Sequence, residues 1–431
     1  MYSYVLLLLS YALVLSTARG RWINTWTSMP QLTEPANLPN PPFNGSTGVF
    51  VNSTLRQTLH MSIGGDQIRV RFSNVFGVNN LDITAATIAL PLDGAPGASA
   101  IDTSTLKTLT FSGNTSYSIP NGALVVSDPV EFHVQHQSTL TVTLYLQAGQ
   151  DGFSITSHPG SRTTTWMSFG NLVAASNITS ASVTSVEHWY FASAVEVWSN
   201  SPSPAAFAII GDSITDGRGS DDNKNNRWPD LVLARMQQNE ATSQIAVNNQ
   251  AAGGNRVLAD GLGPNALGRI DRDVLAQSGI KYAMIFEGVN DIGDADPSEE
   301  SQTLIGDQLI SAYKQIVSRI HTFGIPVFAA TITPFGSPPN TTIQPYSNPV
   351  REATRQRVNA YIRAPGSFDH FIDFDKIVAD PNNPSQLNPA FNSGDFLHPN
   401  VSGYEAIATN FPLDIFEQFA GGVSGFQLYP F

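Results

Sequence analysis

The hydrophobic period of the sequence changes at a polar Pro/Ser stretch, residues 200–204, and this change constrains the fold more than any other feature. Upstream of it, apolar and polar residues alternate with a period of two, and Gly- and Asp-containing turns separate the runs. The clearest runs are Gln67–Phe72, Thr139–Leu146 and Ala192–Trp198. A period of two is typical of strands that bury one face. We therefore predict an antiparallel β-sandwich domain over residues 19–200.

Downstream of a predicted linker at residues 201–205, short apolar strands alternate with longer segments of helical period. The predicted strands are Ala206–Ile210, Ile245–Val247, Tyr282–Phe286 and Val327–Ile332, and the predicted helices are Trp228–Gln238 and Ser301–Phe323. Strand–helix alternation favours a parallel sheet with helices on both faces. Residues 206–431 are therefore predicted to form a layered α/β domain.

The first of these strands runs directly into Gly211, Asp212 and Ser213, and then into a predicted helix start. A serine at that position presents its hydroxyl beside the free N–H groups of a helix N-terminus, where a developing oxyanion would be stabilised. Ser213 is therefore a candidate nucleophile. The alternative is structural, because a strand-to-helix turn often requires Gly, Asp and Ser for its backbone alone.

Two further strings follow the ends of predicted strands. Gly253 and Gly254 occur in Asn249–Arg256, where a glycine N–H can approach a ligand without interference from a Cβ atom. Asn290, in Glu287–Asp291, offers a side-chain amide as a second hydrogen-bond donor. Each string also fits an ordinary turn.

A fourth string near the C-terminus places Asp395 three residues before His398. A carboxylate at this spacing can hold the imidazole in the tautomer of a general base, although His398 alone would more often be structural. In an open α/β sheet, the ligand crevice lies outside the carboxyl ends of the strands. The four strings are therefore expected to converge on one cleft.

Taken in order, the four strings resemble the four sequence blocks of the SGNH subgroup of the GDSL esterases and lipases, over about residues 204–420. The family's first block often continues with Leu, where this chain has Ile214, a mild apolar change. The resemblance implies a flavodoxin-type three-layer fold and ester hydrolysis without cofactor or metal. It also implies that Ser213 is the nucleophile and His398 the base, with Asp395 orienting the imidazole.

An oxyanion hole is implied as well. It would consist of the Ser213 N–H, the Gly254 N–H and the Asn290 side chain. Gly253 competes with Gly254 for the second donor. Gly254 is favoured because it lies five residues after Asn249, which is the usual spacing in the family's second block.

The substrate class is suggested by the segment after the candidate nucleophile, Arg218–Arg227, which is almost wholly polar. A lipase is expected to expose an apolar lid or patch near its site. We therefore expect a serine esterase that removes acetyl or other short acyl groups from a polysaccharide. Two alternatives are a GDSL lipase or phospholipase acting on longer acyl chains and a non-catalytic secreted carbohydrate-binding protein.

The N-terminus predicts export. A mainly apolar stretch, Val5–Leu15, precedes Ser16-Thr17-Ala18, and residues 1–18 are predicted to be a signal peptide. No Lys or Arg precedes the stretch, so an anchor or a core helix is an alternative, but it is too short to span a bilayer comfortably. We expect a secreted protein without stable membrane association.

Six glycosylation sequons accompany the predicted leader, at Asn44, Asn52, Asn114, Asn177, Asn340 and Asn400. They fit a glycosylated extracellular protein. Asn400 lies two residues after the candidate base, where a glycan would crowd the cleft.

Composition excludes several classes of function. The chain has no cysteine, which rules out disulfides, thiolate nucleophiles and thiolate zinc sites. A net charge of -13 without a basic run disfavours nucleic acid and anionic membranes as partners. At 431 residues, the chain is long enough for two domains with cores of their own.

Three weaker features complete the predictions. Asp291, Asp294 and Asp296 have the oxygen-ligand character of a calcium loop, but their spacing fits no such loop, so we expect solvated acids. His158 and Arg162 could reach the cleft, although a solvated loop is the simpler interpretation. Five tryptophans could stack on sugar rings, although core positions are the more common role of tryptophan in a sandwich. They are Trp22, Trp26, Trp166, Trp189 and Trp198.

Overall fold

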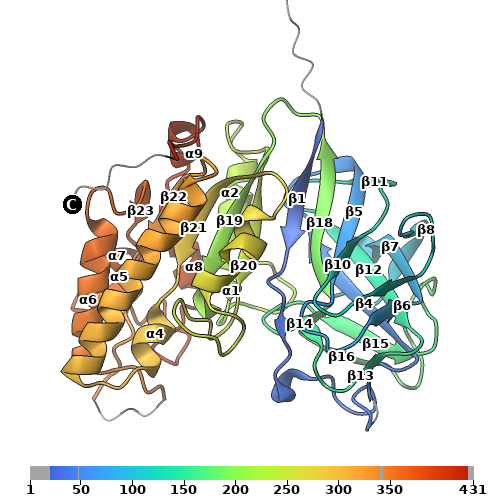
Figure 1. Ribbon diagram of the computed structural model, residues 1–431, viewed down its shortest axis with the longest axis horizontal. Coiled ribbons are helices and arrows are strands. Elements are labelled where there is room, and N and C mark those ends of the chain that lie inside the picture. Colours follow the sequence, from blue (N-terminus) through green and yellow to red (C-terminus); the bar gives the residue numbers. More distant parts are fainter. Residues whose placement is uncertain (1–19, 47, 340, 342, 426–431) are drawn as a thin grey trace, which may run out of the picture.

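The structure, a computed structural model, describes residues 20–425 apart from residues 47, 340 and 342. The predicted signal peptide lies outside the described residues. Two lobes lie side by side: a β-rich lobe formed by the N-terminal part of the chain and an α/β lobe formed by the rest (Figure 1). Among the described residues, no helix is long and apolar enough to cross a membrane.

Two antiparallel sheets form the β-rich lobe, as predicted, and they enclose an apolar core of their own. The first has the order β1-β18-β5-β10, with β11 also paired to β5, and the second has the order β16-β15-β4-β12-β7-β8. The strands of the first are β1 Arg21–Thr27, β5 Gly65–Ser73, β10 Leu124–Val126, β11 Val130–Val134 and β18 Ala192–Ser199. The strands of the second are β4 Ser53–His60, β7 Ala85–Pro91, β8 Ile101–Thr108, β12 Thr139–Leu146, β15 Thr165–Phe169 and β16 Thr184–Val186.

Smaller ladders complete the strand pairing. A three-stranded sheet has the order β17-β14-β2 and lies next to the α/β lobe. Its strands are β2 Gln31–Leu32, β14 Thr156–His158 and β17 Trp189–Tyr190. The two-stranded ladders are β3 Gly48–Val49 with β13 Gln150–Asp151, β6 Leu81–Ile83 with β9 Tyr117–Ile119, and β24 Ala379–Asp380 with β25 Asn383–Leu387.

Strand β12 is buried along its whole length, although its sequence alternates apolar and polar residues. The cause is Arg56 on β4, which is fully buried beside the polar face of β12. Its guanidinium donates to Thr143 Oγ1 at 3.1 Å, to Ser99 O at 2.6 Å and to Ala175 O at 2.8 Å. These contacts hold two loops over the outer face of the sheet, so the face that would be solvated in a simple sandwich is covered.

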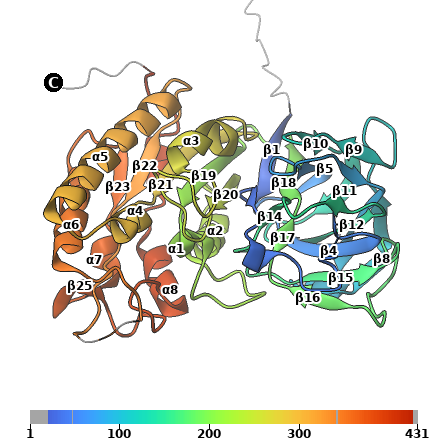
Figure 2. The same ribbon diagram turned by 60° about the horizontal axis from the view of Figure 1, so that its bottom comes forward.

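The α/β lobe contains a five-stranded parallel sheet of order β20-β19-β21-β22-β23. In chain order this is 2-1-3-4-5, the flavodoxin-like arrangement that was predicted. Its strands are β19 Ala205–Gly211, β20 Ile245–Ala251, β21 Ile280–Phe286, β22 Val327–Ala330 and β23 His370–Ile372. Strand β19, which lies between β20 and β21, is buried at every residue, because helices cover both faces of the sheet (Figure 2).

The helices form two groups around this sheet: α2 packs against α8, and α5 packs against α6. Their bounds are α1 Ser213–Asp216, α2 Trp228–Gln237, α3 Ala266–Ile270, α4 Val289–Asp294, α5 Glu299–His321, α6 Pro349–Arg363, α7 Phe374–Val378, α8 Val401–Asn410 and α9 Ile415–Gln418. Helix α5 begins two residues before the predicted start because the Ser298 side chain caps it, accepting a hydrogen bond from the Ser301 N–H.

The two lobes are joined along β20, the edge strand of the parallel sheet. The Ser62 hydroxyl donates to Val247 O at 3.1 Å and accepts from Val247 N at 3.2 Å. One residue further, Asn248 Nδ2 donates to Asn24 O at 2.9 Å. The Ser62 side chain thus satisfies edge groups of Val247 that no neighbouring strand of the parallel sheet reaches, and Asn248 binds the sandwich with its own side chain.

Candidate active site

Ser213 occupies the sharp turn between β19 and α1. The Asp212 side chain caps the helix by accepting a hydrogen bond from the Ile214 N–H at 2.9 Å. Ser213 is the first helical residue, so its own N–H has no partner within the helix. The side chain is largely buried but lines an open cavity. The Ser213 N–H has no hydrogen-bond partner among the described residues, so a hydroxyl and an available N–H group are presented together.

His398 and Asp395 complete a row of hydrogen bonds from the serine. Ser213 Oγ lies 2.7 Å from His398 Nε2, and His398 Nδ1 lies 2.6 Å from Asp395 Oδ2. A carboxylate can only accept, so Nδ1 carries the proton and Nε2 is free to take the proton of Ser213. The N–H groups of Leu397 and His398 also donate to Asp395 Oδ1, at 3.0 and 2.8 Å.

The same contacts keep Asp395 charged. Burial raises the pKa of its carboxyl, but the hydrogen bonds and charge of His398 and the two backbone N–H groups outweigh burial and hold that pKa well below its usual range. A carboxylate fixed in this way can stabilise an imidazolium next to it.

The two glycines of the second string differ in what their N–H groups do. The Gly253 N–H donates to Asp216 Oδ2 at 2.9 Å, whereas no partner for the Gly254 N–H is found in the described part of the chain. Gly254 has a φ of 72°, and a Cβ atom there would lie 2.3 Å from Leu262 Cδ1. Gly254 therefore fits the role of the second donor, at a backbone conformation that residues with a side chain rarely adopt.

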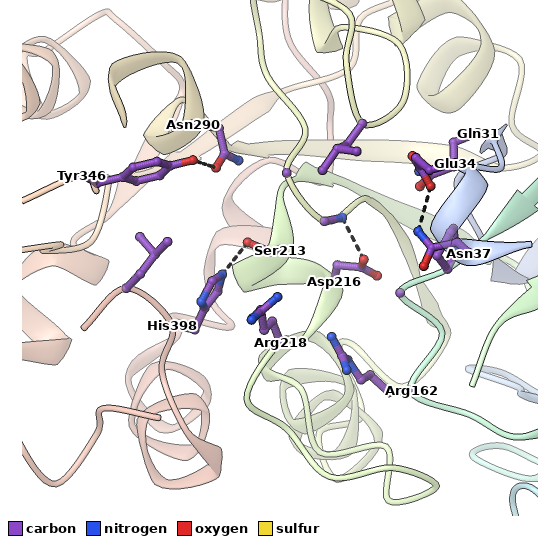
Figure 3. A pocket seen from close by; sticks show the side chains of 16 residues that line it. Gln31, Glu34, Asn37, Arg162, Ser213, Asp216, Arg218, Asn290, Tyr346 and His398 are labelled. Carbon is purple, nitrogen blue, oxygen red and sulfur yellow. Dashed lines mark hydrogen bonds between the residues drawn. The ribbon is translucent and has the colours of Figure 1, made fainter. Parts of the chain in front are cut away.

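The Asn290 amide is oriented at both ends. Its Nδ2 donates to Asn255 O at 2.8 Å, and its Oδ1 lies 3.0 Å from the Tyr346 hydroxyl (Figure 3). One Nδ2–H remains for the cavity, which Asn290 also lines. Sequence reasoning missed Tyr346, because it lies in an irregular segment that no periodic pattern or motif connects to Asn290.

One cavity of about 360 Å³ lies at the carboxyl ends of β19, β20 and β21 (Figure 3). The residues of this site that line it are Ser213, Gly253, Gly254, Asn290, Tyr346 and His398. The predicted strings thus converge there. Its opposite wall comes from the sandwich, which contributes Gln31, Glu34, Asn37, Pro159, Gly160 and Arg162. On this wall the Glu34 carboxylate accepts from Gln31 Nε2 at 2.7 Å and from Asn37 Nδ2 at 2.9 Å. Sequence reasoning missed these three residues, since only the packing of the two lobes brings them to the cavity.

Residues 209–406 match the model of the GDSL-like Lipase/Acylhydrolase family. These residues form a GDSL-like hydrolase domain. The expected resemblance is confirmed, and the domain is a carboxylic ester hydrolase. No curated protein sequence matches the chain.

Several solved structures are similar to about half of the chain. A putative lipolytic G-D-S-L protein from Desulfitobacterium hafniense is 21% identical, with a TM-score of 0.35, over 48% of this chain and 97% of its own. The acetyl xylan esterase AlAXEase is 20% identical, with a TM-score of 0.37, over 48% of this chain and 96% of its own. A carbohydrate acetylesterase family member from Sinorhizobium meliloti is 13% identical, with a TM-score of 0.38, over 50% and 99%.

The expected solvated loop around His158 and Arg162 is wrong. His158 is the last residue of β14 and is only 4% exposed, because its ring stacks on Trp189 at the junction of the two lobes. Its Nε2 lies 2.9 Å from Asp216 Oδ1 of the GDSL-like domain. Arg162 lines the cavity that contains Ser213. Both residues therefore reach across the junction.

The expectation of solvated acids is also wrong for Asp291. This carboxylate is buried, and it accepts hydrogen bonds from the N–H groups of Val257 and Leu258, both at 2.9 Å. It thus fixes the chain beyond Gly254 rather than facing water. Across the residues that the structure describes, no three His, Cys, Asp or Glu side chains are grouped as a metal site requires.

Three buried acids lie around the base of the nucleophile turn. Burial raises the pKa of Asp212 to about 7, that of Glu287 to about 8 and that of Asp291 to about 6. Arg269 Nη2 approaches Glu287 Oε2 at 3.5 Å and lowers that pKa in part. The protonation of these groups therefore changes across the ordinary pH range.

The tryptophans of the sandwich pack within or against it. Trp26 and Trp189 are buried and meet edge to face, with ring centroids 4.9 Å apart. Trp22 and Trp198 contact each other at 5.4 Å, and Trp166 Nε1 donates to Gly97 O at 2.7 Å. None of the described residues that line the cavity is a tryptophan.

The sequons differ in how free their side chains are. Asn52, Asn114 and Asn177 are exposed, whereas Asn340 lies outside the described residues. Asn400 caps α8, and its Nδ2 donates to Ala390 O at 3.0 Å and to Asn392 O at 3.2 Å. Attachment of a glycan would remove one of these donors, so the structure disfavours modification at Asn400.

Proposed function

We propose that the protein is a secreted serine esterase that removes acetyl or other short acyl groups from polysaccharides through an acyl-enzyme on Ser213. The observation that carries this proposal is the 2.7 Å contact between Ser213 Oγ and His398 Nε2, at a cavity that also contains unpaired N–H donors.

The first half-reaction follows from the hydrogen bonds. Ser213 Oγ attacks the ester carbonyl carbon while its proton passes to His398 Nε2, and Asp395 stabilises the resulting imidazolium. The carbonyl oxygen becomes an oxyanion. The imidazolium then gives its proton to the departing alcohol oxygen, the carbon–oxygen bond breaks, and the acyl group remains on Ser213. Water repeats the same steps and releases the acid.

The oxyanion would be held by three donors: the Ser213 N–H, the Gly254 N–H and the free Nδ2–H of Asn290. Each is already oriented by contacts to the surrounding chain, so little reorganisation is needed when charge develops. The Gly253 N–H is occupied by Asp216, which favours Gly254 as the second donor.

The polar wall from the sandwich supports an acylated carbohydrate as substrate. Gln31, Glu34 and Asn37 supply amide and carboxylate groups that can exchange hydrogen bonds with sugar hydroxyls. The volume of about 360 Å³ is at the lower end of the range of small-molecule sites, about 300–1,000 Å³. A small acyl group fits this space better than a long chain.

Export is part of the proposal. It is supported by the apolar leader pattern within residues 1–18 and by the exposed sequons Asn52, Asn114 and Asn177. Signal-peptide cleavage and glycan mass, measured on protein secreted by a eukaryotic host, test this part separately from the chemistry.

The decisive experiment is hydrolysis of 4-nitrophenyl esters from acetate to palmitate by the wild type and by Ser213→Ala. We expect activity on acetate that declines with chain length and is lost in the variant. A long-chain optimum would favour a lipase, and activity that does not depend on Ser213 would contradict the proposed nucleophile. Release of acetate from acetylated and chemically deacetylated xylan then tests the polysaccharide.

A further inference from the structure

His158 belongs to the sandwich and does not line the cavity, yet it is connected to the oxyanion-binding turn. It ends β14, is almost completely buried, and stacks on Trp189 with ring centroids 5.7 Å apart and planes 24° apart. The ring is therefore fixed by packing within the sandwich.

Both ring nitrogens of His158 meet acceptors. Nδ1 lies 3.0 Å from Met29 O, and Nε2 lies 2.9 Å from Asp216 Oδ1. A carbonyl oxygen cannot donate, so Nδ1 carries a proton, and a second proton lies in the contact between Nε2 and the carboxylate. His158 thus binds its own lobe with one nitrogen and the GDSL-like domain with the other.

Asp216 passes this constraint to the oxyanion turn. It is the last residue of α1, the short helix that begins with Ser213. Its Oδ2 accepts the Gly253 N–H at 2.9 Å. A Cβ atom on Gly160 would lie 1.7 Å from Oδ2, so the sandwich backbone also closes against this carboxylate. The Asp216 carboxylate is thus held between His158 and Gly160 of the sandwich on one side and the Gly253 N–H on the other.

We propose that His158 is a positioning residue for ester hydrolysis: through Asp216 it fixes the Gly253–Gly254 turn and thereby aims the Gly254 N–H at the oxyanion. The sandwich lobe is then a part of the catalytic apparatus rather than only an attached binding module. This inference rests on the proposed function, because it assigns Gly254 to the oxyanion hole. Loss of the link leaves substrate contacts intact and misplaces one donor, so it lowers kcat more than it changes KM.

Two amide substitutions separate the two bonds of His158. A glutamine amide reaches about as far as Nε2 and can still donate to Asp216, whereas an asparagine amide reaches only as far as Nδ1 and can donate to Met29 O. Complete loss of an oxyanion donor costs about 100- to 1,000-fold in kcat. A displaced donor should cost less, so for His158→Asn we expect a decrease of about 10- to 100-fold in kcat on 4-nitrophenyl acetate, with KM within about threefold of wild type. His158→Gln should restore most of the activity.

Ser62→Ala is the matched control. It removes two other buried hydrogen bonds between the lobes, both to Val247, at a point remote from the Gly253 turn along β20. Melting temperatures of the variants report any loosening of the junction. We expect Ser62→Ala to lower the melting temperature with kcat near that of the wild type.

Each outcome decides the inference. A wild-type kcat in His158→Asn would overturn it. Equal decreases of kcat in His158→Asn and His158→Gln would also overturn it, and so would a decrease in Ser62→Ala as large as that in His158→Asn. Either of these two results would mean that His158 acts through packing alone. Ser213→Ala, assayed beside them, tests the proposed function independently: if it keeps activity, the esterase site itself is wrong, whereas if it is inactive, the His158 results concern positioning only.

Discussion

The hydroxyl of Tyr346 lies 3.0 Å from Asn290 Oδ1 and 3.1 Å from Asp294 Oδ1. The carboxylate and the amide oxygen compete for one phenolic proton. Because Asn290 Nδ2 also donates to Asn255 O, the amide plane is set by contacts on either side of it.

Tyr346→Phe should therefore loosen Asn290 without removing it. A neutral hydrogen bond contributes about 0.5–1.5 kcal/mol, so we expect kcat to fall by about 2- to 10-fold. Steady-state hydrolysis of 4-nitrophenyl acetate measures the effect. Asp294→Ala, which removes the competing acceptor together with a 3.8 Å ion pair to Arg256, serves as the control. Unchanged kcat in Tyr346→Phe would mean that the phenol does not orient the amide.

Asn290→Ala should reduce kcat by about 100- to 1,000-fold, because it removes an oxyanion donor outright. The substitution removes two side-chain hydrogen bonds, to Asn255 O and with the Tyr346 hydroxyl, and we expect the protein to remain folded. Circular dichroism and the melting temperature check the fold, and kcat checks the chemistry. Near-normal activity in a folded variant would remove Asn290 from the oxyanion hole.

The two neighbouring glycines offer a matched pair. In Gly254→Ala the new methyl group meets Leu262 Cδ1 at 2.3 Å, and the backbone is held at a φ of 72°, so we expect losses of both stability and kcat. In Gly253→Ala the nearest atom, Asp216 Oδ2, is 3.8 Å away, so the loss should be smaller. Thermal unfolding and kcat of the two variants give the comparison. Equal losses of stability and kcat in the two variants would show that the backbone conformation at Gly254 is not what limits substitution.

The buried acids predict that stability declines as pH rises. Asp212, Glu287 and Asp291 have pKa values raised to about 7, 8 and 6, so between about pH 4 and pH 8 these three groups bind more protons in the folded state than in the unfolded state. Asp395 acts in the opposite direction, because its lowered pKa makes stability fall as pH drops below the unfolded value near 4. Burial also lowers the pKa of His188 to about 4, which makes stability rise with pH up to the unfolded value near 6.5. The decline of the melting temperature should therefore be clearest between about pH 6.5 and pH 8.

Asp212→Asn tests the source of this decline. The amide oxygen can still accept the Ile214 N–H, but the group no longer titrates. We expect the melting temperature of the variant to depend less on pH between 5 and 8 than that of the wild type. Parallel curves for both proteins would assign the decline to other groups.

Sequence patterns located the chemistry because it is tied to strand ends. Ser213, Gly254 and Asn290 each follow an apolar strand, and parallel strands bring their carboxyl ends to one edge whatever the loops do. The partners of these groups were not established from the sequence, since Tyr346 carried no signal and His158 was expected to lie in a solvated loop. Tyr346 and His158 act through contacts made only after distant segments pack, and no local period or spacing encodes such contacts.

Local sequence patterns also mispredicted which side chains are buried. The alternation in β12 indicated one solvated face, but the fully buried Arg56 draws two loops over it. Likewise Asp291, expected to be hydrated, is enclosed because its two oxygens bind the N–H groups of Val257 and Leu258. In each case a charged side chain binds backbone polar groups and is buried with them. A hydropathy pattern, by contrast, predicts that a charged side chain is exposed.

The hydrogen bonds between the sandwich and the edge of β20 affect any attempt to produce the GDSL-like domain alone. A fragment beginning at residue 205 would leave the N–H and carbonyl of Val247, now satisfied by Ser62, open along a sheet edge. Such an edge recruits other strands, so the isolated fragment should self-associate rather than behave as a minimal esterase.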